Sequence, residues 1–394
     1  MLKNRNLLII ALIAVVNALG YGIIIPILYS YSRKYGLTDF ENGLLFSFFS
    51  IAQFFATPII GRLSDKYGRK PLLVISLLGT AVSFTIMAYA PSAIYLFIAR
   101  ILDGLTSGNL PVAQAVISDS TDVKDRAKGF GVMGAAFGFG FIFGPAISAL
   151  TLTFSASAPF IIAAIVSALA VILTALLLPE TNTHRQTVIK GKFFDWQKLF
   201  GAVFDEAIGD TLLISLLYIL AFSMFIYAFQ PYSVEVLRLD ATKISLIFTG
   251  VGIMGLITQV LILPRVIRIL SERKLLSLAL SASVIVFLVI FLVRNIWIFL
   301  IAILVNAVAN GLVMPMITTL LSKEMDEKSQ GSIMGLNTSY QSIGFIFGPI
   351  IGGALASLLI PLPFLFAGLT FLICYFLSRK ILKVQLHKKP AFDI

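Results

Sequence analysis

The sequence has few charged side chains, and this scarcity excludes a soluble globular protein. Asp, Glu, Lys and Arg make up 12% of the 394 residues, and hydrophobic residues make up 58%. A soluble domain carries about 25% charged residues. Several apolar runs, among them 211–230 and 275–293, exceed the ~18 residues that mark a membrane-spanning helix. The chain is therefore expected to be an all-α, multi-pass membrane protein.

Cysteine and histidine are also scarce. The single cysteine, Cys374, lies in an apolar run, and the two histidines, His184 and His387, lie in polar segments. One cysteine excludes a disulfide framework and a cysteine-based metal site. An intramembrane enzyme would need a nucleophile with its base, a metal-ligand set or paired carboxylates inside the spans. The spans hold none of these, so we expect neither an enzyme nor a metal site.

Charged and turn-rich breaks divide the chain into twelve apolar segments. The longest polar stretch, 179–210, separates them into two groups of six. The expected fold is two pseudo-symmetric six-helix bundles, 1–178 and 211–378, joined by the central loop and followed by a tail, 379–394. The expected transmembrane helices are 6–28, 42–62, 71–90, 92–117, 129–150, 159–178, 211–230, 244–264, 275–293, 297–321, 332–355 and 361–378.

Lysine and arginine are distributed unevenly between the two sides of these helices. With the N-terminus inside, the inner segments hold 24 of the 30 Lys and Arg residues, and the outer loops hold five. Loops rich in Lys and Arg remain in the cytoplasm. We therefore expect a protein of the cytoplasmic membrane with both termini and the central loop in the cytoplasm. The same bias accounts for the net charge of +11 without a nucleic-acid partner.

One hexapeptide, Gly-Phe-Ile-Phe-Gly-Pro, occurs twice, at 140–145 and at 344–349. The two copies lie 204 residues apart, and so do Pro111 and Pro315. The copies fall in the fifth and eleventh spans, which are equivalent positions in two six-helix halves. Parallel repeats with a site between them near the midplane are a known transporter plan.

The hexapeptides combine closely spaced glycines with a proline. Small residues at such spacing let helices pack closely in lipid, and a proline can bend a helix. We predict that both helices need the same bend and the same close packing at the interface of the two halves. The alternative is helix packing with no further role. The residues concerned are Gly140, Gly144, Pro145, Gly348 and Pro349.

Arg100 and Asp103 form the only ionisable pair placed within a span. They are three residues apart and therefore lie on one helical face. Arg100 lies about 14 Å along the helix axis from Pro91, close to the middle of the bilayer. A charge there costs at least ~2.5 kcal/mol, so the pair should face the bundle interior. Asp103 either loads and releases a proton tuned by Arg100, or forms a permanent ion pair that packs the bundle.

The sharpest motif is Gly61-Arg-Leu-Ser-Asp-Lys-Tyr-Gly-Arg-Lys70, on the inner side between the second and third spans. Gly61 would let two helices approach closely, and Gly68 permits a tight turn. Asp65 and Arg69 supply opposite charges that can hold the cytoplasmic side of a bundle closed. The ten residues resemble the signature loop of the major facilitator superfamily, G-x-L-a-D-r-x-G-r-k.

This resemblance implies that Asp65, Arg69 and Asp119 form a charge relay, and that this relay holds the outward-open state. It also implies that Arg100 takes part in proton coupling, because Ala99–Gly104 resembles the R-x-x-q-G motif of the superfamily with Asp103 at the usual glutamine place. The residues assigned to the cytoplasmic gate are Gly61, Asp65, Gly68, Arg69, Asp119 and Arg126.

The chain most resembles the tetracycline efflux-like branch of the drug:proton antiporters. Tetracycline exporters carry an acidic residue early in the first helix, where Asn17 stands here, and others in the third and ninth helices that are missing here. Asp103 therefore remains the candidate proton carrier. Within the antiporter motif G-x-x-x-G-P-x-x-G-G, the first copy has Ser148 and Ala149 at the last two glycines. The resemblance is carried by 19–26, 61–73, 99–104, 117–122, 126–127 and 130–140.

Uncharged polar side chains inside the spans are candidates for the lining of a central substrate cavity. The alternative for each one is an interhelical hydrogen bond. They are Asn17, Tyr21, Gln53, Asn109, Gln114, Tyr227, Gln259, Asn306, Asn310, Asn337, Tyr340 and Gln341.

The resemblance implies a secondary active transporter that works by alternating access. The expected activity is proton-coupled efflux (antiport) of small amphipathic or drug-like compounds, driven by the proton gradient with no cofactor. Its expected partners are a small-molecule substrate, protons and the lipid bilayer, and a monomer is expected. One alternative is a uniporter or exporter of a small metabolite, such as a sugar, without proton coupling. Another is a non-transporting membrane receptor or scaffold.

Overall fold

The structure is a computed structural model that describes residues 2–121, 126–182, 196–205, 208–324 and 330–383. These residues form helices joined by turns, and no strand occurs among them. The all-α prediction is confirmed. Residues 183–195 and 206–207 of the predicted central loop and residues 384–394 of the predicted tail lie outside the described residues.

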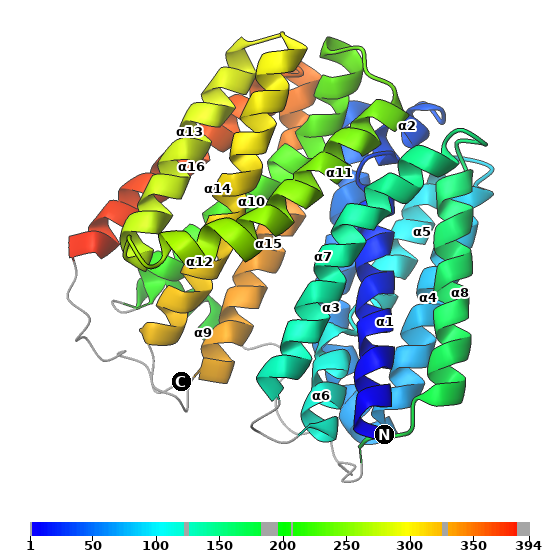
Figure 1. Ribbon diagram of the computed structural model, residues 1–394. Coiled ribbons are helices and arrows are strands. Elements are labelled where there is room, and N and C mark those ends of the chain that lie inside the picture. Colours follow the sequence, from blue (N-terminus) through cyan, green and yellow to red (C-terminus); the bar gives the residue numbers. More distant parts are fainter. Residues whose placement is uncertain (1, 122–125, 183–195, 206–207, 325–329, 384–394) are drawn as a thin grey trace. The chain divides into compact units, whose positions relative to one another are not determined.

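The chain forms two compact units. The first comprises Met1–Thr38, Phe48–Phe193 and Asp240–Thr249. It thus includes most of α3 (Asp39–Tyr67) and the beginning of α11 (Ala241–Ile257). Its other helices are α1 (Leu2–Ile24), α2 (Leu28–Arg33), α4 (Arg69–Ala88), α5 (Ala93–Thr106), α6 (Leu110–Ser120), α7 (Arg126–Thr151) and α8 (Ala158–Leu177) (Figure 1).

The second unit comprises Asp39–Ser47, Phe194–Leu239 and Gly250–Ile394. It contains the beginning of α3 (Asp39–Tyr67) and the remainder of α11, which continues through a π-helical stretch, Thr258–Ile262, into the short α12 (Leu263–Val266). Its other helices are α9 (Trp196–Gly201), α10 (Gly209–Pro231), α13 (Glu272–Leu292), α14 (Ile296–Lys323), α15 (Gln330–Leu358) and α16 (Leu362–Lys383).

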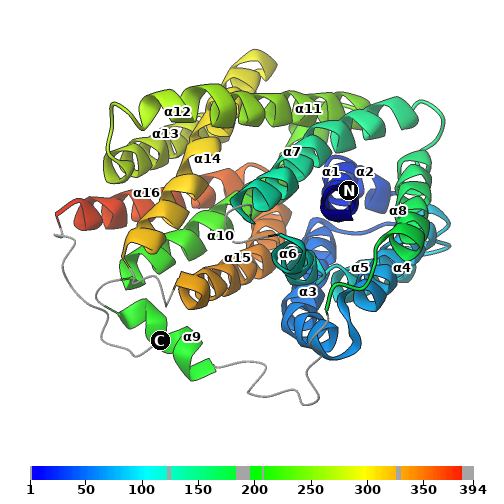
Figure 2. The ribbon, with the colours of Figure 1, turned by 60° about the horizontal axis from the view of Figure 1, so that its bottom comes forward.

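Helix contacts repeat from one unit to the other. In the first unit α1 packs on α7 and α8, and α4 packs on α8 and α5. In the second unit α10 packs on α15 and α16, and α13 packs on α16 and α14. Figure 2 shows α1 flanked by α7 and α8 within its own unit. The repeated pairing agrees with the constant offset between the two hexapeptides.

Eleven helices among the described residues are long and apolar enough to cross a membrane. The remaining predicted span, 92–117, is interrupted, because α5 ends at Thr106 and α6 begins at Leu110. The two pieces contain 14 and 11 residues, so neither reaches spanning length alone. The continuous helix predicted there is replaced by two short helices with a break between them.

The break follows from Pro111 together with the three residues Ser107, Gly108 and Asn109 that precede it closely. Pro111 lacks the amide proton that a continuous helix would donate to the carbonyl of Ser107, and its ring crowds that carbonyl. Proline alone is not sufficient, because α14 continues through the equivalent Pro315. Glycine, serine and asparagine offer the backbone alternatives to the helix, whereas α14 has Gly-Leu-Val at the matching positions.

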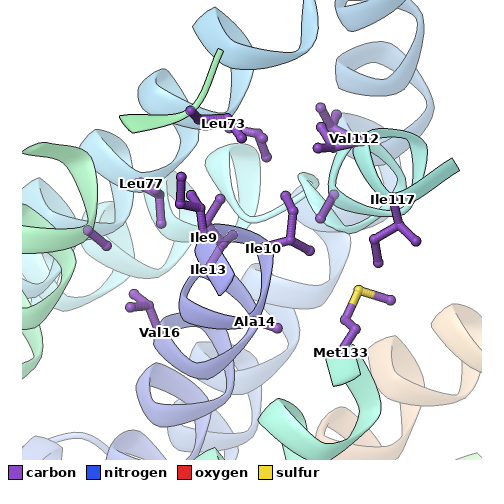
Figure 3. Close-up of a cluster of buried hydrophobic side chains, with 14 of the residues drawn as sticks. Ile9, Ile10, Ile13, Ala14, Val16, Leu73, Leu77, Val112, Ile117 and Met133 are labelled. Atoms are coloured by element: carbon purple, nitrogen blue, oxygen red, sulfur yellow. The ribbon is translucent and has the colours of Figure 1, made fainter. Parts of the chain in front are cut away.

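Branched apolar side chains fill the space around α1 in the first unit. Figure 3 shows Ile9, Ile10 and Ile13 between Leu77 on one side and Val112 on the other. All of these residues are at most 4% exposed. Close packing of this kind holds helices together in lipid, where no hydrophobic force drives them to associate. This core fixes the positions of α4 and α6 relative to α1.

Candidate functional site

A buried ion pair lies on α5 in the first unit. Arg100 Nη1 lies 3.3 Å from Asp103 Oδ2. The two residues are only 3% and 5% exposed. A residue spacing of three places both side chains on one helical face, and here that face is turned into the bundle. An ion pair of such burial is strongly destabilised when one partner is removed.

Two hydroxyl groups complete the surroundings of the Asp103 carboxylate. Thr80 on α4 donates a hydrogen bond to Asp103 Oδ1 over 3.1 Å. Ser107, the first residue after α5, donates to the same oxygen over 3.0 Å. Ser107 follows Asp103 by four residues, so helical spacing brings its hydroxyl onto the carboxylate. One oxygen accepts two hydroxyl protons, and the other faces the guanidinium.

Arg100 has a second partner in an aromatic ring. Its Cζ atom lies 4.2 Å from the centroid of the Phe49 ring on α3, a cation–π distance. The Tyr21 ring stands edge-on to Phe49 with a centroid distance of 5.3 Å. Arg100 Nε has no hydrogen-bond partner among the described residues. The guanidinium is therefore held by one carboxylate and one ring, and part of its donor capacity stays unused.

The predicted cavity residues of the first unit gather beside this pair, with one exception. Asn17 Nδ2 on α1 donates to Asn109 Oδ1 at the helix break over 2.8 Å. Gln53 Nε2 donates to the Ser107 carbonyl over 3.3 Å. Asn17 Oδ1 and Asn109 Nδ2 have no partner within the described part of the chain. Gln114, the exception, has an exposed side chain on α6.

Several predicted cavity residues of the second unit form interhelical hydrogen bonds. On α10, Ser215 Oγ donates to Asn337 Oδ1 over 2.6 Å. Gln341 Nε2 lies 3.5 Å from the same Ser215 hydroxyl. One turn along α10, the Tyr218 hydroxyl donates to Asn310 Oδ1 over 3.1 Å. These contacts join α10 to α14 and α15. Asn310, Asn337 and Gln341 therefore form interhelical hydrogen bonds, the alternative to lining a cavity.

The four remaining candidates of the second unit have different surroundings. The Tyr227 and Tyr340 hydroxyls donate to backbone carbonyls, those of Asp39 and Leu199. Gln259 is exposed, and Asn306 is 2% exposed. Among the described residues the Asn306 Oδ1 atom lacks a hydrogen-bond donor.

The predicted gate residues of the first unit form a connected charge cluster. Arg69 Nη1 lies 2.6 Å from Asp65 Oδ1, and Arg69 Nε lies 3.3 Å from Asp119 Oδ2. Ser64 Oγ also accepts a proton from Arg69 Nη1 over 2.6 Å. One guanidinium thereby joins the end of α3, the start of α4 and the end of α6. Arg126 begins α7, and its side chain lies outside the described residues.

The two glycines of this motif differ in their surroundings. Gly68 has a φ of 108°, a conformation that L side chains rarely adopt, so it permits the turn between α3 and α4. A Cβ atom built on Gly61 would meet no described atom within 4 Å. The close helix approach predicted at Gly61 is therefore not found. Its carbonyl instead accepts a 2.6 Å hydrogen bond from the Ser64 hydroxyl.

Glu180 belongs to this cluster and was missed by the sequence reasoning. Its carboxylate accepts hydrogen bonds from the backbone amides of Arg69, over 2.9 Å, and Lys70, over 3.3 Å. These amides begin α4, where the positive end of the helix dipole favours a carboxylate. Asn182 extends the contact, because its Nδ2 donates to the Asp65 carbonyl over 2.9 Å. No local pattern indicates this role, since Glu180 and Arg69 are 111 residues apart.

Removing the Glu180 carboxylate is expected to loosen the start of α4. Glu180→Ala leaves two helix-terminal amides without their acceptor, at an expected cost of about 1–2 kcal/mol in unfolding free energy. Glu180→Gln keeps one acceptor oxygen and is expected to lose less than half as much. Thermal unfolding of the purified protein measures both. Equal stability of the two variants and wild type would show that the cap contributes nothing.

The second unit carries a charge-reversed counterpart of the ion pair between Arg69 and Asp119. Lys323 Nζ lies 2.6 Å from Glu272 Oε1 and joins the end of α14 to the start of α13. Lys323 occupies the position equivalent to Asp119 by the offset of 204. The second unit therefore joins the equivalent helix ends with the signs exchanged, although its loop has lost the glycines and the aspartate of the first copy.

Burial raises the pKa of the neighbouring Glu324 carboxyl from its ordinary 4.5 to about 7, against the opposing effect of a hydrogen bond from Thr211. The Thr211 hydroxyl lies 3.1 Å from Glu324 Oε1, and Arg273 and Asp210 act on the carboxyl through their charges. The folded protein thus holds a proton that the unfolded chain has already lost at about pH 5–7. Stability contributed by this group must therefore fall as the pH rises through that window.

Glu324→Gln is expected to remove this pH dependence. Above about pH 8 the variant should be more stable than wild type by about 1–2 kcal/mol, a value discounted for partial exposure of the side chain. At about pH 5 the two proteins should unfold at the same temperature. Melting curves in detergent between about pH 5 and 9 test this, and parallel curves for both proteins would contradict it.

Each hexapeptide packs its glycines against a helix of its own unit. A Cβ on Gly140 would lie 2.3 Å from Ala18 Cβ, and one on Gly144 would lie 2.7 Å from Gly22 Cα, both on α1. In the second unit a Cβ on Gly348 would lie 2.7 Å from the Leu220 carbonyl on α10. Close packing is thus observed inside each unit, between α7 and α1 and between α15 and α10, whereas the prediction placed it at the interface of the two halves. Both helices continue through their prolines, Pro145 and Pro349.

Among the described residues no group of three or more His, Cys, Asp or Glu side chains is placed to hold a metal ion. The chemically distinctive groups are instead one buried ion pair, two ion-paired clusters at helix ends and a broken helix. Together with many spanning helices and an internal repeat, they define a multi-pass membrane protein of the transporter type.

Comparison with known proteins identifies the family. The Major Facilitator Superfamily profile matches residues 10–208 and 211–393. Multidrug resistance protein 1 of Bacillus subtilis (strain 168) is 35% identical over 379 residues, which cover 94% of this chain and 95% of that protein. The class H tetracycline resistance protein of Pasteurella multocida is 30% identical, and the match covers 88% of each chain. The chain belongs to the major facilitator superfamily.

Solved structures share the fold at low sequence identity. The human organic anion transporter MFSD10 has a TM-score of 0.72 and 21% identity, and the match covers 95% of this chain and 99% of that one. The nucleoside transporter NupG has a TM-score of 0.77 and 14% identity, with coverages of 96% and 100%. These likenesses support the major facilitator fold. The chain is a transporter of small molecules and not an enzyme.

Proposed function

We propose that this protein exports small amphipathic or drug-like compounds in exchange for protons, by alternating access. The observation that carries the proposal is the buried pair of Arg100 and Asp103. Asp103 is the one carboxylate in the middle of a span among the described residues. A buried ionisable group inside a membrane costs free energy, so its presence there indicates a function. Relatives named for multidrug and tetracycline resistance support efflux of drug-like compounds.

The surroundings of Asp103 suit a group that gains and loses a proton. In the anionic form the carboxylate accepts from Thr80 and Ser107 and faces Arg100. Protonation would cancel its attraction for the guanidinium. Arg100 would then keep the Phe49 ring, 4.2 Å away, as its remaining partner. A buried arginine without any partner is the main obstacle to a proton carrier beside it, and the contact with the Phe49 ring offsets part of that cost.

A place for the substrate is suggested by the unused polar groups beside this pair. Asn17 Oδ1, Asn109 Nδ2 and Arg100 Nε are buried without partners among the described residues. Tyr21 and Phe49 add aromatic surface next to them. Aromatic rings together with a few neutral polar groups suit an amphipathic compound. A substrate that approaches Arg100 or Asp103 would couple its own binding to the protonation of the carboxylate.

The charge cluster around Arg69 is proposed as the cytoplasmic gate of this cycle. It joins the ends of α3, α4 and α6, and Glu180 and Asn182 attach the segment after α8 to it. Breaking and remaking these contacts would let helix ends separate during alternating access. The proton gradient is the proposed energy source, with no cofactor. The protein is proposed to act as a monomer in the cytoplasmic membrane with both termini in the cytoplasm.

A facilitator without proton coupling is the second candidate. It is favoured by the absence from the sequence of the other acids that tetracycline exporters carry inside their helices. In this alternative, Arg100 and Asp103 form a permanent structural pair, and the substrate is a neutral metabolite such as a sugar.

Transport by the purified protein in liposomes distinguishes the two candidates. A pH gradient is imposed, and the accumulation of fluorescent lipophilic cations, neutral amphipathic compounds and a radiolabelled sugar is measured. The proposal predicts that cations or amphipathic compounds accumulate only with the gradient, and that an ionophore abolishes the accumulation. Equilibration of the sugar, independent of the gradient, would support the facilitator. No movement of any compound would favour a non-transporting receptor.

A further inference from the structure

A basic hollow lies between α13 and α16 in the second unit. Its volume is about 570 Å³. It is formed where α13 begins and α16 approaches its end, and the chain just before α13 closes one side. Figure 1 shows α13 and α16 side by side. The lining includes Lys274, Ser277, Leu278, Ser281, Tyr375 and Arg379.

The two cations of the hollow differ from their neighbours. Lys323 and Lys380 form ion pairs with Glu272 and Asp210. Lys274 and Arg379 are exposed, and within the described part of the chain neither forms an ion pair or a hydrogen bond. No acidic residue of the described chain lines the hollow. Two cations without a carboxylate favour an anionic ligand.

The polar groups line one stretch of each helix. Lys274, Ser277 and Ser281 follow one face of α13 over two turns. Tyr375 and Arg379 are one turn apart on α16. The hydroxyl of Ser277 thus lies between the ammonium group and the apolar part of α13. This arrangement offers charge at the helix ends and hydroxyl groups one to two turns deeper.

An exposed apolar strip continues from the hollow along α13. Leu278, which lines the hollow, is 57% exposed, and Ile285 and Leu292 are 63% and 74% exposed. Their spacing of seven residues places them on one helical face. The strip extends about 21 Å from Leu278 to Leu292, which is comparable to the length of an extended acyl chain. A free inorganic anion would have no use for such a strip.

We propose that this hollow binds an anionic phospholipid of the phosphatidylglycerol class. Its phosphate lies between Lys274 and Arg379, the glycerol headgroup meets the serine and tyrosine hydroxyls, and one acyl chain follows the strip of Leu278, Ile285 and Leu292. Basic pockets between transmembrane helices on the cytoplasmic side bind such headgroups, and the charge distribution predicts that this end is cytoplasmic. The site is separate from the ion pair of the first unit.

Native mass spectrometry of the full-length protein in detergent tests this site. Wild type, the double variant Lys274→Gln/Arg379→Gln and the control Lys380→Gln are titrated with phosphatidylglycerol, phosphatidylethanolamine and inorganic phosphate. Wild type should retain one phosphatidylglycerol, with an affinity about tenfold higher than that of the double variant. The control removes the adjacent cation of α16 and should bind within about twofold of wild type. All replaced side chains are exposed, so folding should be unaffected.

Three results would overturn the proposal. The first is that the double variant binds phosphatidylglycerol with the same affinity as wild type. A second is an equal loss in Lys380→Gln, which would reduce the effect to overall charge. The third is displacement of the bound lipid by inorganic phosphate at equal concentration, which would identify a site for a free anion.

Discussion

Asp103→Asn is expected to reduce gradient-driven substrate accumulation to that of empty liposomes. Asparagine has nearly the shape of aspartate and still accepts hydrogen bonds from Thr80 and Ser107, but it cannot exchange a proton. Substrate exchange without a gradient should persist, because the helices can still change their arrangement. Counterflow and gradient-driven uptake, measured on the same preparation, separate the two steps. Uptake at the wild-type level in Asp103→Asn would exclude Asp103 as the proton carrier.

Stability measurements distinguish this effect from simple loss of an ion pair. Asp103→Asn leaves Arg100 buried without its counter-charge, at an expected cost of about 3–5 kcal/mol. The double variant Arg100→Gln/Asp103→Asn removes both charges and should recover most of this loss. If Asp103 carries the proton, the recovered double variant still fails to couple transport to the gradient. If the pair is only structural, coupling returns with stability.

Gly144→Ala is expected to separate α7 from α1 and to destabilise the first unit by at least about 2 kcal/mol. The added Cβ would lie 2.7 Å from Gly22 Cα, 2.8 Å from the Gly22 carbonyl carbon and 3.0 Å from Ile23 N. These are backbone atoms, so no side chain can rotate away to make room. The two helices must move apart, and transport should fall with the yield of folded protein.

Gly138→Ala is the matched control, because it changes the same residue type on the same helix. A Cβ there would meet no described atom within 4 Å. Alanine also favours the helix over glycine by about 1 kcal/mol, so this variant should be as stable as wild type or slightly more so. Thermal unfolding in detergent compares the two. Equal melting temperatures for Gly144→Ala and Gly138→Ala would show that close helix approach is not what these glycines provide.

The fold could be predicted because its signals can be read directly from the sequence. These signals are the apolar runs of spanning length, the Lys and Arg bias over the whole chain, and the hexapeptide that repeats once in each half. The all-α architecture and the superfamily were therefore predicted correctly. The break between α5 and α6 was missed, because Pro111 has an equivalent in Pro315 that leaves α14 intact. Only the neighbouring Ser107, Gly108 and Asn109 distinguish the two cases, together with the tertiary hydrogen bonds that Gln53 and Asn17 donate to Ser107 and Asn109.

The candidate site was predicted in part. A residue spacing of three placed Arg100 and Asp103 on one face, and their burial follows from the cost of charge in lipid. Thr80, Phe49 and Glu180 were not found, because each reaches its partner from another helix or segment and has no distinctive neighbours in sequence. The close approach predicted at Gly61 has no counterpart among the described residues. A glycine indicates available space only when another helix passes there, and local sequence does not contain that information.

The central claim is that export is exchanged against protons through Asp103, and simultaneous measurement of both fluxes tests it most directly. Wild-type protein is placed in liposomes that contain a trapped pH-sensitive dye, and a transported cation is added at one side without an imposed pH gradient. The account predicts proton movement opposite to the substrate, dependent on substrate concentration and absent in Asp103→Asn. Substrate movement without any proton movement, unchanged in Asp103→Asn, would contradict it.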